Sequence, residues 1–271
     1  MEAVKHFIKK HFSRLLYKRK TNAARRLELE QHTAAMRKQQ PASIADASFD
    51  IFTYHGEDGI LHYLLSFLPD APRRFVDVGS GDCIKSNCAM LAVQLGWEGV
   101  FIDKNKRQLA VGRHFYGSLS TANKLSFTEA AVTPATINQL ATSRQAGVLS
   151  IDIDGNDYWI WKALDAIQPE VVIIEAKVEF GQRNCVVPEG PGNHHAVDPM
   201  YNGASVEALT RLGRSKGYKL AGANKQGYNL FFVKQHHPLP EVSAASVLND
   251  PDTVSSFYPD TFFHTHTFTE A

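Results

Sequence analysis

The segment FVDVGSGD, residues 75–82, begins as a short apolar run and ends in a glycine-rich turn. Such a run bounded by glycines predicts a buried strand followed by a tight turn. The next segment, KSNCAMLAVQLGW (85–97), has a helical pattern. Glycines let the backbone approach a ligand closely, and the helix that follows points its amino end at the same place. The segment therefore predicts a ligand site at the carboxyl end of a strand.

Strand and helix patterns alternate along the chain on both sides of this segment. This alternation predicts a mostly parallel sheet with helices on both faces. The last two strands are joined by the short segment NKQG, which predicts a hairpin that sets one antiparallel strand at the sheet edge. The expected strands are 73–79, 98–103, 124–133, 147–152, 169–178, 218–223 and 228–233.

The glycine turn fits two kinds of nucleotide cofactor. A dinucleotide fingerprint G-x-G-x-x-G matches Gly79 and Gly81, but its third position is Ile84, which disfavours NAD. The pattern D-x-G-x-G, starting at Asp77, looks instead like the first motif of class I S-adenosylmethionine-dependent methyltransferases, which bind the amino-acid end of the cofactor at this loop. We expect the Asp77 carboxylate to face the cofactor ammonium group. Asp103, at the end of the second strand, is expected to accept the ribose hydroxyls, with a helix cap as its alternative role.

A longer set of segments resembles FkbM-type methyltransferases over about residues 50–235. The resemblance implies the Rossmann-like class I methyltransferase fold, with seven strands and an antiparallel last one, and methyl transfer, often to oxygen on sugars or other metabolites. In this fold the end of the third strand lies near the adenine, which assigns Glu129 to the cofactor. Asp154 and Asp157 stand where the family usually has glutamates. The matching segments are YHGEDGIL (54–61), FVDVGSGD (75–82), SIDIDGNDYWIWKAL (150–164), EVVIIEAK (170–177), GASVEALTRLGRSKGY (203–218) and GYNLFFV (227–233).

Three carboxylates follow neighbouring strands of the predicted sheet. Asp152 and Asp154 end the fourth strand and Glu175 ends the fifth. Because ligands bind beyond the carboxyl ends of parallel strands, we expect these side chains to converge at the active site. They can hold Mg²⁺ or another divalent cation, or directly orient substrate hydroxyls or the cofactor ammonium group. Asn156 and Asp157 are expected to begin the next helix.

The segment 177–202 shows no clear secondary-structure pattern, which is typical of a functional loop. His194 and His195 lie in it, and histidine is a suitable general base for an alcohol near neutral pH. We predict that these histidines and Tyr201 reach the acceptor. In the segment FFHTHTFTEA (262–271), His264 and His266 are expected in a terminal strand or tail without a metal.

The first forty residues form a separate, basic segment. They hold eleven Lys/Arg against three Glu, a net charge of +8, so the remaining chain carries −7. Apolar residues at helical spacing between lysines predict an amphipathic helix that binds an anionic membrane surface, or that packs on the domain or on a partner. We expect no nucleic-acid binding, because no basic surface with aromatic residues continues into the rest of the chain. The expected division is 1–40 (arm), 41–240 (S-adenosylmethionine-binding domain) and 241–271 (tail).

The three cysteines, Cys83, Cys88 and Cys185, are too few and too scattered for a disulfide framework. With no apolar run of membrane length and no secretory signal, the chain is expected in the cytoplasm, with the arm as a peripheral anchor. The leading hypothesis is methyl transfer from S-adenosylmethionine to a hydroxyl of a small molecule or glycan. The alternative is a non-catalytic module of this fold, held at a membrane or partner by its basic arm, which predicts an empty or blocked cofactor cleft.

Overall fold

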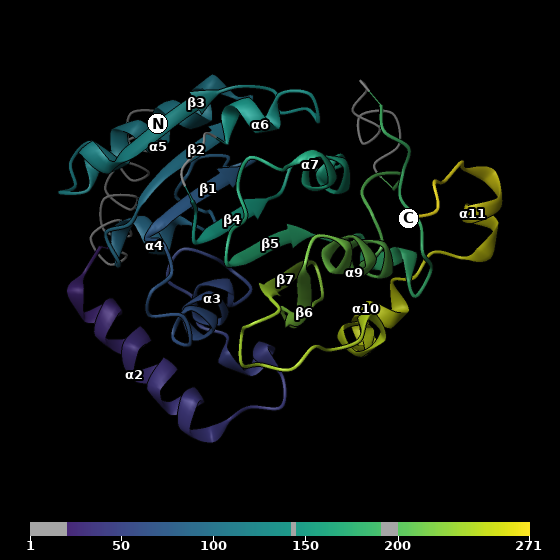
Figure 1. Cartoon of the computed structure of the whole chain (residues 1–271), viewed down its shortest axis with the longest axis horizontal. Coiled ribbons are helices and arrows are strands. Elements are labelled where there is room, and N and C mark those ends of the chain that lie inside the picture. Colours follow the sequence, from purple (N-terminus) through teal and green to yellow (C-terminus); the bar gives the residue numbers. More distant parts are fainter. Residues whose placement is uncertain (1–20, 142–144, 191–199) are drawn as a thin grey trace, which may run out of the picture.

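The structure is a computed structural model that describes residues 21–141, 145–190 and 200–271. Its centre is a seven-stranded sheet in the order β3-β2-β1-β4-β5-β7-β6 (Figure 1). Strands β1 to β5 pair in parallel, while β7 pairs antiparallel with both β5 and β6. The strands are β1 (Arg74–Val78), β2 (Glu98–Asp103), β3 (Leu125–Glu129), β4 (Val148–Ile151), β5 (Val171–Glu175), β6 (Tyr218–Ala223) and β7 (Asn229–Lys234).

This topology confirms the class I methyltransferase fold that the sequence predicts, with a hairpin at one edge. One detail differs from the expected edge strand. The antiparallel strand β7 lies between β5 and β6, so β6 occupies the edge itself. Because β7 runs antiparallel to its neighbours, the β6–β7 turn lies at the same edge of the sheet as the carboxyl ends of β1 to β5, which we call the carboxyl edge.

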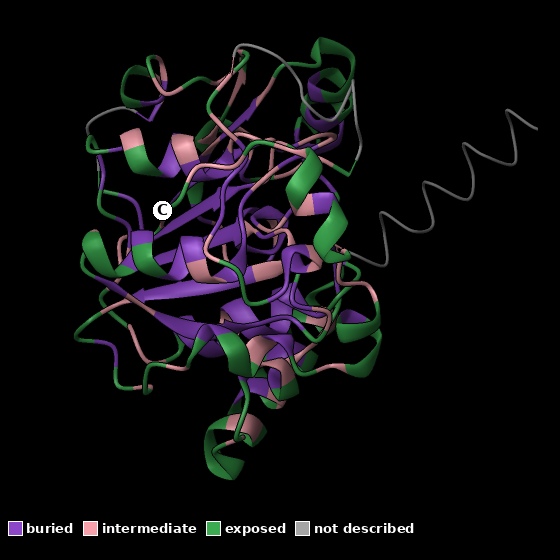
Figure 2. Cartoon of the chain, turned by 90° about the vertical axis from the view of Figure 1, so that its right-hand side faces the viewer, coloured by how far each residue is buried: buried purple, intermediate pink, exposed green. Residues whose placement is uncertain are grey.

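Helices cover both faces of the sheet, and each face has its own core. Residues of α2, α3, α4 and α5 pack on one face, and residues of α6, α7 and α9 on the other. Figure 2 shows the strands buried and the outward sides of the helices exposed. The helices are α2 (Ala23–Gln39), α3 (Glu57–Leu65), α4 (Ala89–Val93), α5 (Lys106–Tyr116), α6 (Ile137–Leu140), α7 (Asp157–Ala163), α9 (Val206–Ser215), α10 (Pro251–Ser255) and α11 (Asp260–Thr265), with short 3-10 turns η1 (Ile44–Ala47), η2 (Ala122–Lys124), η3 (Val178–Phe180) and η4 (Ala244–Leu248).

Alternation along the central strands produces this two-sided core. In β5, Val171 and Ile173 join the core under α3, while Val172 and Ile174 join the core under α7. Successive side chains of a strand point to opposite faces, and a strand covered on both faces is apolar throughout. The same alternation places the side chain of Glu175 on the face that α3 covers.

The N-terminal helix of the described part, α2, packs on the domain. Its Leu29 is fully buried in the same core as α3, and Thr33 Oγ1 lies 2.6 Å from His62 Nδ1 on α3. Residues 1–20, the larger part of the predicted arm, lie outside the described residues. Among the residues that are described, no helix is both long and apolar enough to span a bilayer.

The C-terminal segment forms a small aromatic core of its own. Phe180 is fully buried there against Phe262, and Phe268 packs on the same cluster. The predicted terminal strand or tail is therefore wrong over α11, where the chain is helical. The His266 ring stacks on Phe262 with its Nδ1 2.9 Å from that residue's carbonyl oxygen, so His264 and His266 do not form a strand pair.

Candidate functional site

The glycine turn after β1 lies against the end of β4. Gly79 has a φ of +83°, and a Cβ added to it would lie 1.7 Å from the carbonyl oxygen of Asp152. Any side chain would therefore collide with backbone, which explains the glycine at this position. The backbone N–H of Gly79 donates to the carbonyl of Ile102 (2.9 Å), and that of Gly81 donates to Asp103 Oδ2 (2.8 Å). The turn is thus held between β2 and β4.

A cleft of about 540 Å³ opens beyond the carboxyl ends of β1, β2 and β4. Its size is in the range of small-molecule sites. Four of the predicted cofactor residues, Gly79, Gly81, Asp103 and Asp152, line it, together with Asp154. The remaining lining residues are Ile102, Lys104, Asn105, Gln108, Ala130, Ala131, Val132, Thr133, Ile153, Gly155, Asn156 and Gly190.

Asp103 does two things at the cleft. Its Oδ2 accepts from the N–H of Gly81 and its Oδ1 from the N–H of Asn105 (2.6 Å), so the carboxylate joins the glycine turn to the start of α5. The Asn105 side chain, rather than Asp103, caps that helix by accepting from Arg107 and Gln108. A carboxylate has about four acceptor positions, so each oxygen of Asp103 retains capacity for a hydroxyl in the cleft.

Asp77 does not line the cleft, in contrast to its predicted contact with the cofactor. The side chain is buried beneath the glycine turn, where its Oδ2 accepts a hydrogen bond from the Ser86 hydroxyl. Burial raises the pKa of Asp77 to about 7, with Asp103 adding to the rise and the Ser86 hydrogen bond opposing it. The strand alternation explains the position, because Asp77 points to the α3 and α4 face and not out of the sheet edge.

Glu129 is also absent from the cleft lining. Its exposed carboxylate lies 3.8 Å from Lys106 Nζ, and the next residues, Ala130 to Thr133, line the cleft instead. The chain turns after β3, so backbone and small apolar side chains face the position expected for an adenine. The segment after β3 therefore lines the cleft, whereas the predicted side chain, Glu129, lies outside it.

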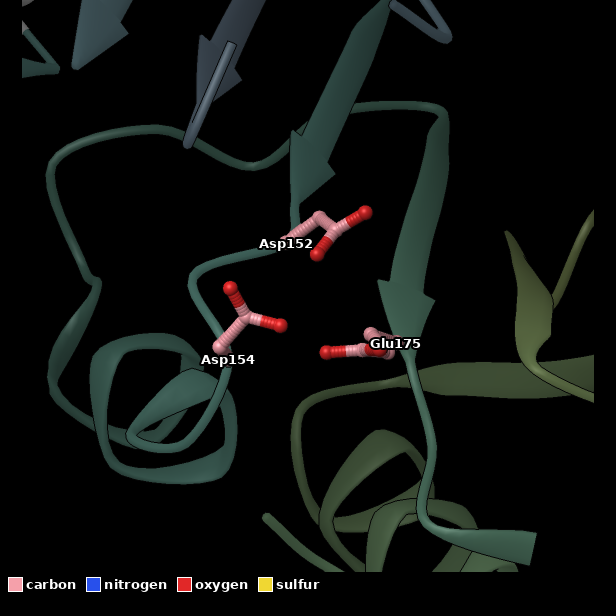
Figure 3. A group of neighbouring side chains, drawn as sticks. All are labelled: Asp152, Asp154 and Glu175. Carbon is pink, nitrogen blue, oxygen red and sulfur yellow. The ribbon is translucent and has the colours of Figure 1, made fainter. Parts of the chain in front are cut away.

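The three carboxylates at the ends of β4 and β5 converge as predicted (Figure 3). One oxygen each of Asp152, Asp154 and Glu175 lies within 4.8 Å of the others. Burial, followed by the charges of the neighbouring carboxylates, raises the pKa of Asp152 and of Glu175, and a hydrogen bond between the two side chains opposes the rise for Asp152. The pair therefore holds a proton more strongly than separate carboxyl groups would.

The backbone after β4 is strained at the residue that brings the third carboxylate into the cluster. Asp154 has a φ of +57°, which a residue with a side chain rarely adopts. The turn is held by Asp157, whose carboxylate accepts from the N–H groups of Ile153 and Gly155, both at 2.9 Å. Left-handed residues outside glycine cost of order 1–3 kcal/mol and cluster at functional sites.

The predicted helix start at Asn156 and Asp157 is confirmed, but the Asn156 side chain does not cap the helix. The Asn156 side chain makes no cap hydrogen bond and instead donates to the carbonyl of Gly190 (3.2 Å). Trp161 is buried in the core, and Trp159 Nε1 donates to the carbonyl of Val187 (2.9 Å). Asn156 and Trp159 thus hold the segment 187–190 beside the cleft.

The predicted general bases, His194 and His195, lie outside the described residues. Tyr201, predicted to reach the acceptor, points elsewhere: its hydroxyl donates to the carbonyl of Thr267 and its ring packs on Phe268. The C-terminal aromatic core holds this part of the segment, a long-range contact that no local sequence pattern reveals.

One buried network near the site was missed by the sequence analysis. The Glu57 carboxylate, buried at the start of α3, accepts from the side chains of Asn224 (2.9 Å) and Asn229 (3.0 Å). Asn229 is the direct cross-strand partner of Glu175. The network ties the amino end of α3 to the strand ends that carry the acidic cluster. Its only sequence signal is an acidic pair, Glu57-Asp58, in an otherwise apolar helix.

No family model and no curated protein matches the sequence. Solved structures with similar folds include the pyocyanin biosynthetic protein PhzM (16% identity, 63% of this chain and 53% of that one, TM-score 0.39). Others are magnesium protoporphyrin IX methyltransferase from Synechocystis PCC 6803 with bound SAM (13%, 66% and 78%, 0.44) and an O-methyltransferase from Bacillus cereus in complex with SAH (16%, 78% and 91%, 0.43). The chain thus spans only about half the length of PhzM.

Proposed function

We propose that the chain transfers a methyl group from S-adenosylmethionine to a hydroxyl oxygen of a small molecule or glycan, as an FkbM-like enzyme. One observation carries the proposal. A single cleft joins the glycine turn and Asp103, which suit a nucleoside, to Asp152 and Asp154, which suit a polar acceptor. The alternative, a non-catalytic module, predicts a cleft that stays empty or is blocked, and a measured affinity for S-adenosylhomocysteine distinguishes the two.

The lining residues fit the proposed cofactor. Ile102, Ala130 and Val132 offer apolar surface for a flat base, and Asp103 offers free acceptor positions for ribose hydroxyls. Gly79 and Gly81 carry no side chain, so the amino-acid part of the cofactor could approach the backbone closely at this turn. S-Adenosylmethionine supplies an electrophilic methyl group, which is released as its bond to sulfur breaks and S-adenosylhomocysteine forms.

The chain's own residues supply orientation and a proton acceptor. The acceptor hydroxyl binds at Asp154 and Glu175, and its proton passes to a carboxylate of the cluster as the oxygen–methyl bond forms. Burial and the neighbouring carboxylates raise the pKa of Asp152 to about 7, close to neutral pH, where a general base is most effective. They raise the pKa of Glu175 to about 10, so Glu175 keeps its proton and orients the hydroxyl while Asp152 accepts the proton. The positioning of the two reactants is the main contribution expected from the protein.

The same three carboxylates suit a divalent cation, which we include in the proposal. Oxygen ligands bind Ca²⁺ at about 2.3–2.6 Å, so two ligands across one ion are about 4.8 Å apart, the separation limit seen here. Asp152, Asp154 and Glu175 would hold the ion, which would lower the pKa of an acceptor hydroxyl. An ion would also displace the proton that the Asp152–Glu175 pair holds.

Calorimetry with S-adenosylhomocysteine tests the cofactor assignment. We expect binding by the intact chain, and at least about tenfold weaker binding by Asp103→Asn, which loses the charged acceptor for the ribose. The matched control is Asp82→Asn, in the same turn but outside the cleft lining. No binding at high micromolar concentration, or equal effects of both variants, would rule the assignment out.

The metal is tested separately. Calorimetric titration with Mg²⁺, Mn²⁺ or Ca²⁺ should show tighter binding at higher pH, because the ion competes with the proton of the acidic pair. Glu175→Gln should abolish the titration and leave S-adenosylhomocysteine binding in place. Once an acceptor is known, full activity in EDTA would contradict the metal but not the methyl transfer.

A further inference from the structure

A second surface of the molecule, at the opposite edge of the sheet from the cleft, carries its own hollows. Two adjoining hollows of about 510 and 190 Å³ share Arg73 and Leu95 in their lining. The larger is bordered by residues that begin or precede strands, including Arg74 and Lys124. We call this surface, centred on Arg26, Arg73, Arg74 and Lys124, the amino-edge face.

The cations of the amino-edge face are only partly neutralised. Arg74 lies 3.9 Å from Glu98, a loose pair with Glu98 half exposed, and Lys124 Nζ donates to the carbonyl of Gly96 (3.0 Å). Arg26 pairs with Glu30 at 2.8 Å. Arg73 is exposed, and its guanidinium has no hydrogen-bond or ion-pair partner among the residues that the structure describes. Its donors are therefore available to an anion from outside.

The basic N-terminal segment joins the domain at this same face. Arg26, in the first turn of α2, lines the smaller hollow together with Arg73. In Figure 1 the arrowheads of β4 and β5 point toward α7, and α2 begins on the opposite side. Residues 1–20 hold seven Lys/Arg and one Glu, so they carry +6, whereas residues 21–271 carry −5. Cationic groups are thus concentrated on one side of an otherwise acidic chain.

Charge favours one kind of occupant for this face. The face and the sequence of residues 1–20 carry the same sign of charge, so both are attracted to one extended anionic surface. The segment 1–20 places Phe7, Ile8, Phe12 and Leu15 at helical spacing between its lysines, a pattern typical of helices that lie in the headgroup region of a bilayer. Nucleic acid would use the charges but not these apolar residues.

We propose that the amino-edge face and residues 1–20 together bind a bilayer that contains anionic phospholipids, with the catalytic cleft turned away from the bilayer. The length of a strand separates the amino-edge face from the cleft. Strand β1 has five residues, which span about 16 Å at about 3.3 Å per residue. This exceeds the screening length of about 8 Å at physiological salt. Membrane binding therefore leaves the cleft open to water, and the acceptor enters from the solvent side.

Co-sedimentation of the full chain with vesicles tests the surface. Vesicles of phosphatidylcholine with phosphatidylglycerol should bind the chain, and vesicles of phosphatidylcholine alone should not. Arg73→Glu/Lys124→Glu should weaken partitioning at least about 25-fold, because each basic residue near the surface contributes about fivefold. The control Lys106→Glu/Lys225→Glu makes the same change of net charge at the carboxyl edge and should have little effect.

Three results would overturn the proposal. They are no binding of the intact chain to anionic vesicles, equal losses in the two double variants, and binding to duplex DNA or RNA in place of vesicles. Thermal unfolding of both double variants checks that each is folded, and Arg73→Gln/Lys124→Gln repeats the test without charge reversal. The orientation has its own readout. The affinity for S-adenosylhomocysteine should be the same with and without saturating vesicles, and a tenfold loss on vesicles would contradict an outward-facing cleft.

Discussion

Replacing Asp77 by asparagine removes a buried carboxyl group while keeping its shape and its acceptor for the Ser86 hydroxyl. Burial raises the pKa of Asp77 from its ordinary value of 3.8 to about 7 in the folded chain. Between these two pH values the unfolded chain releases a proton that the folded chain keeps. The stabilising effect of the protonated group is thus complete below pH 3.8 and is lost as the pH rises to about 7.

The magnitude follows from the two pKa values. One pH unit corresponds to about 1.4 kcal/mol, so a rise from 3.8 to about 7 makes ionisation of the folded state about 4 kcal/mol less favourable. Asparagine has no such ionisation. We therefore expect Asp77→Asn to gain stability over the natural chain as the pH rises, by about 3–4 kcal/mol between pH 4 and pH 8, and to gain nothing more above that.

Urea unfolding at a series of pH values, without ligand, measures this difference. Ser86→Ala is the control, because it removes the hydrogen bond that opposes the rise in the Asp77 pKa. In the natural chain it should extend the loss of stability to higher pH, because the Asp77 pKa rises further, and it should have a pH-independent effect in the Asp77→Asn background. A stability difference between Asp77→Asn and the natural chain that is the same at pH 4 and pH 8 would refute the reasoning.

Three further variants test the local geometry. Gly79→Ala places a Cβ against the Asp152 carbonyl at a positive φ, so we expect at least about 2 kcal/mol of destabilisation and loss of S-adenosylhomocysteine binding; unchanged affinity in calorimetry would contradict the close approach. Asp58 is buried, and its Oδ2 accepts from three successive backbone N–H groups. In urea unfolding, Asp58→Ala should therefore lower the free energy of unfolding by about 3 kcal/mol or more, and Asp58→Asn by clearly less. Equal losses in the two variants would point to packing alone. Phe262→Ala should destabilise the C-terminal core by about 3 kcal/mol and speed amide exchange in residues 257–269, with S-adenosylhomocysteine affinity unchanged; slow exchange there would show that the cluster does not depend on this ring.

Local patterns predicted the strands well and the helices less well. An apolar run such as VVII in β5 is a specific signal for a buried strand, because a strand covered on both faces needs an apolar side chain at every position. One helix was predicted longer than it is: the helical pattern over residues 85–97 is observed as a helix only over Ala89–Val93. Tertiary contacts with the sheet select which part of a helical pattern is helical, and a single sequence holds no record of them.

The candidate site divides in the same way. The sequence predicts that residues at the strand ends lie at one edge of the sheet, because parallel strands bring their carboxyl ends together whatever the loops do. The structure places Gly79, Asp103 and Asp152 in the cleft lining and Glu175 beside Asp152. The rule does not say which side chain at a strand end faces the cleft. Glu129 ends β3 beside the cleft, but its carboxylate points to Lys106 because the chain bends after the strand.

The succession of strands and helices along the chain, the parallel core, the final hairpin and the edge at which ligands are expected to bind already follow from the alternation of the sequence. These features depend on periodicity and on the short reach of turns, which are local properties. The burial of Asp77 beneath its own glycine turn, the use of Asp157 to hold the Asp154 turn, and the docking of residues 257–271 on Phe180 depend on which distant residues come into contact. Burial and pKa are set by all the atoms around a group, so they exist only once the chain has folded.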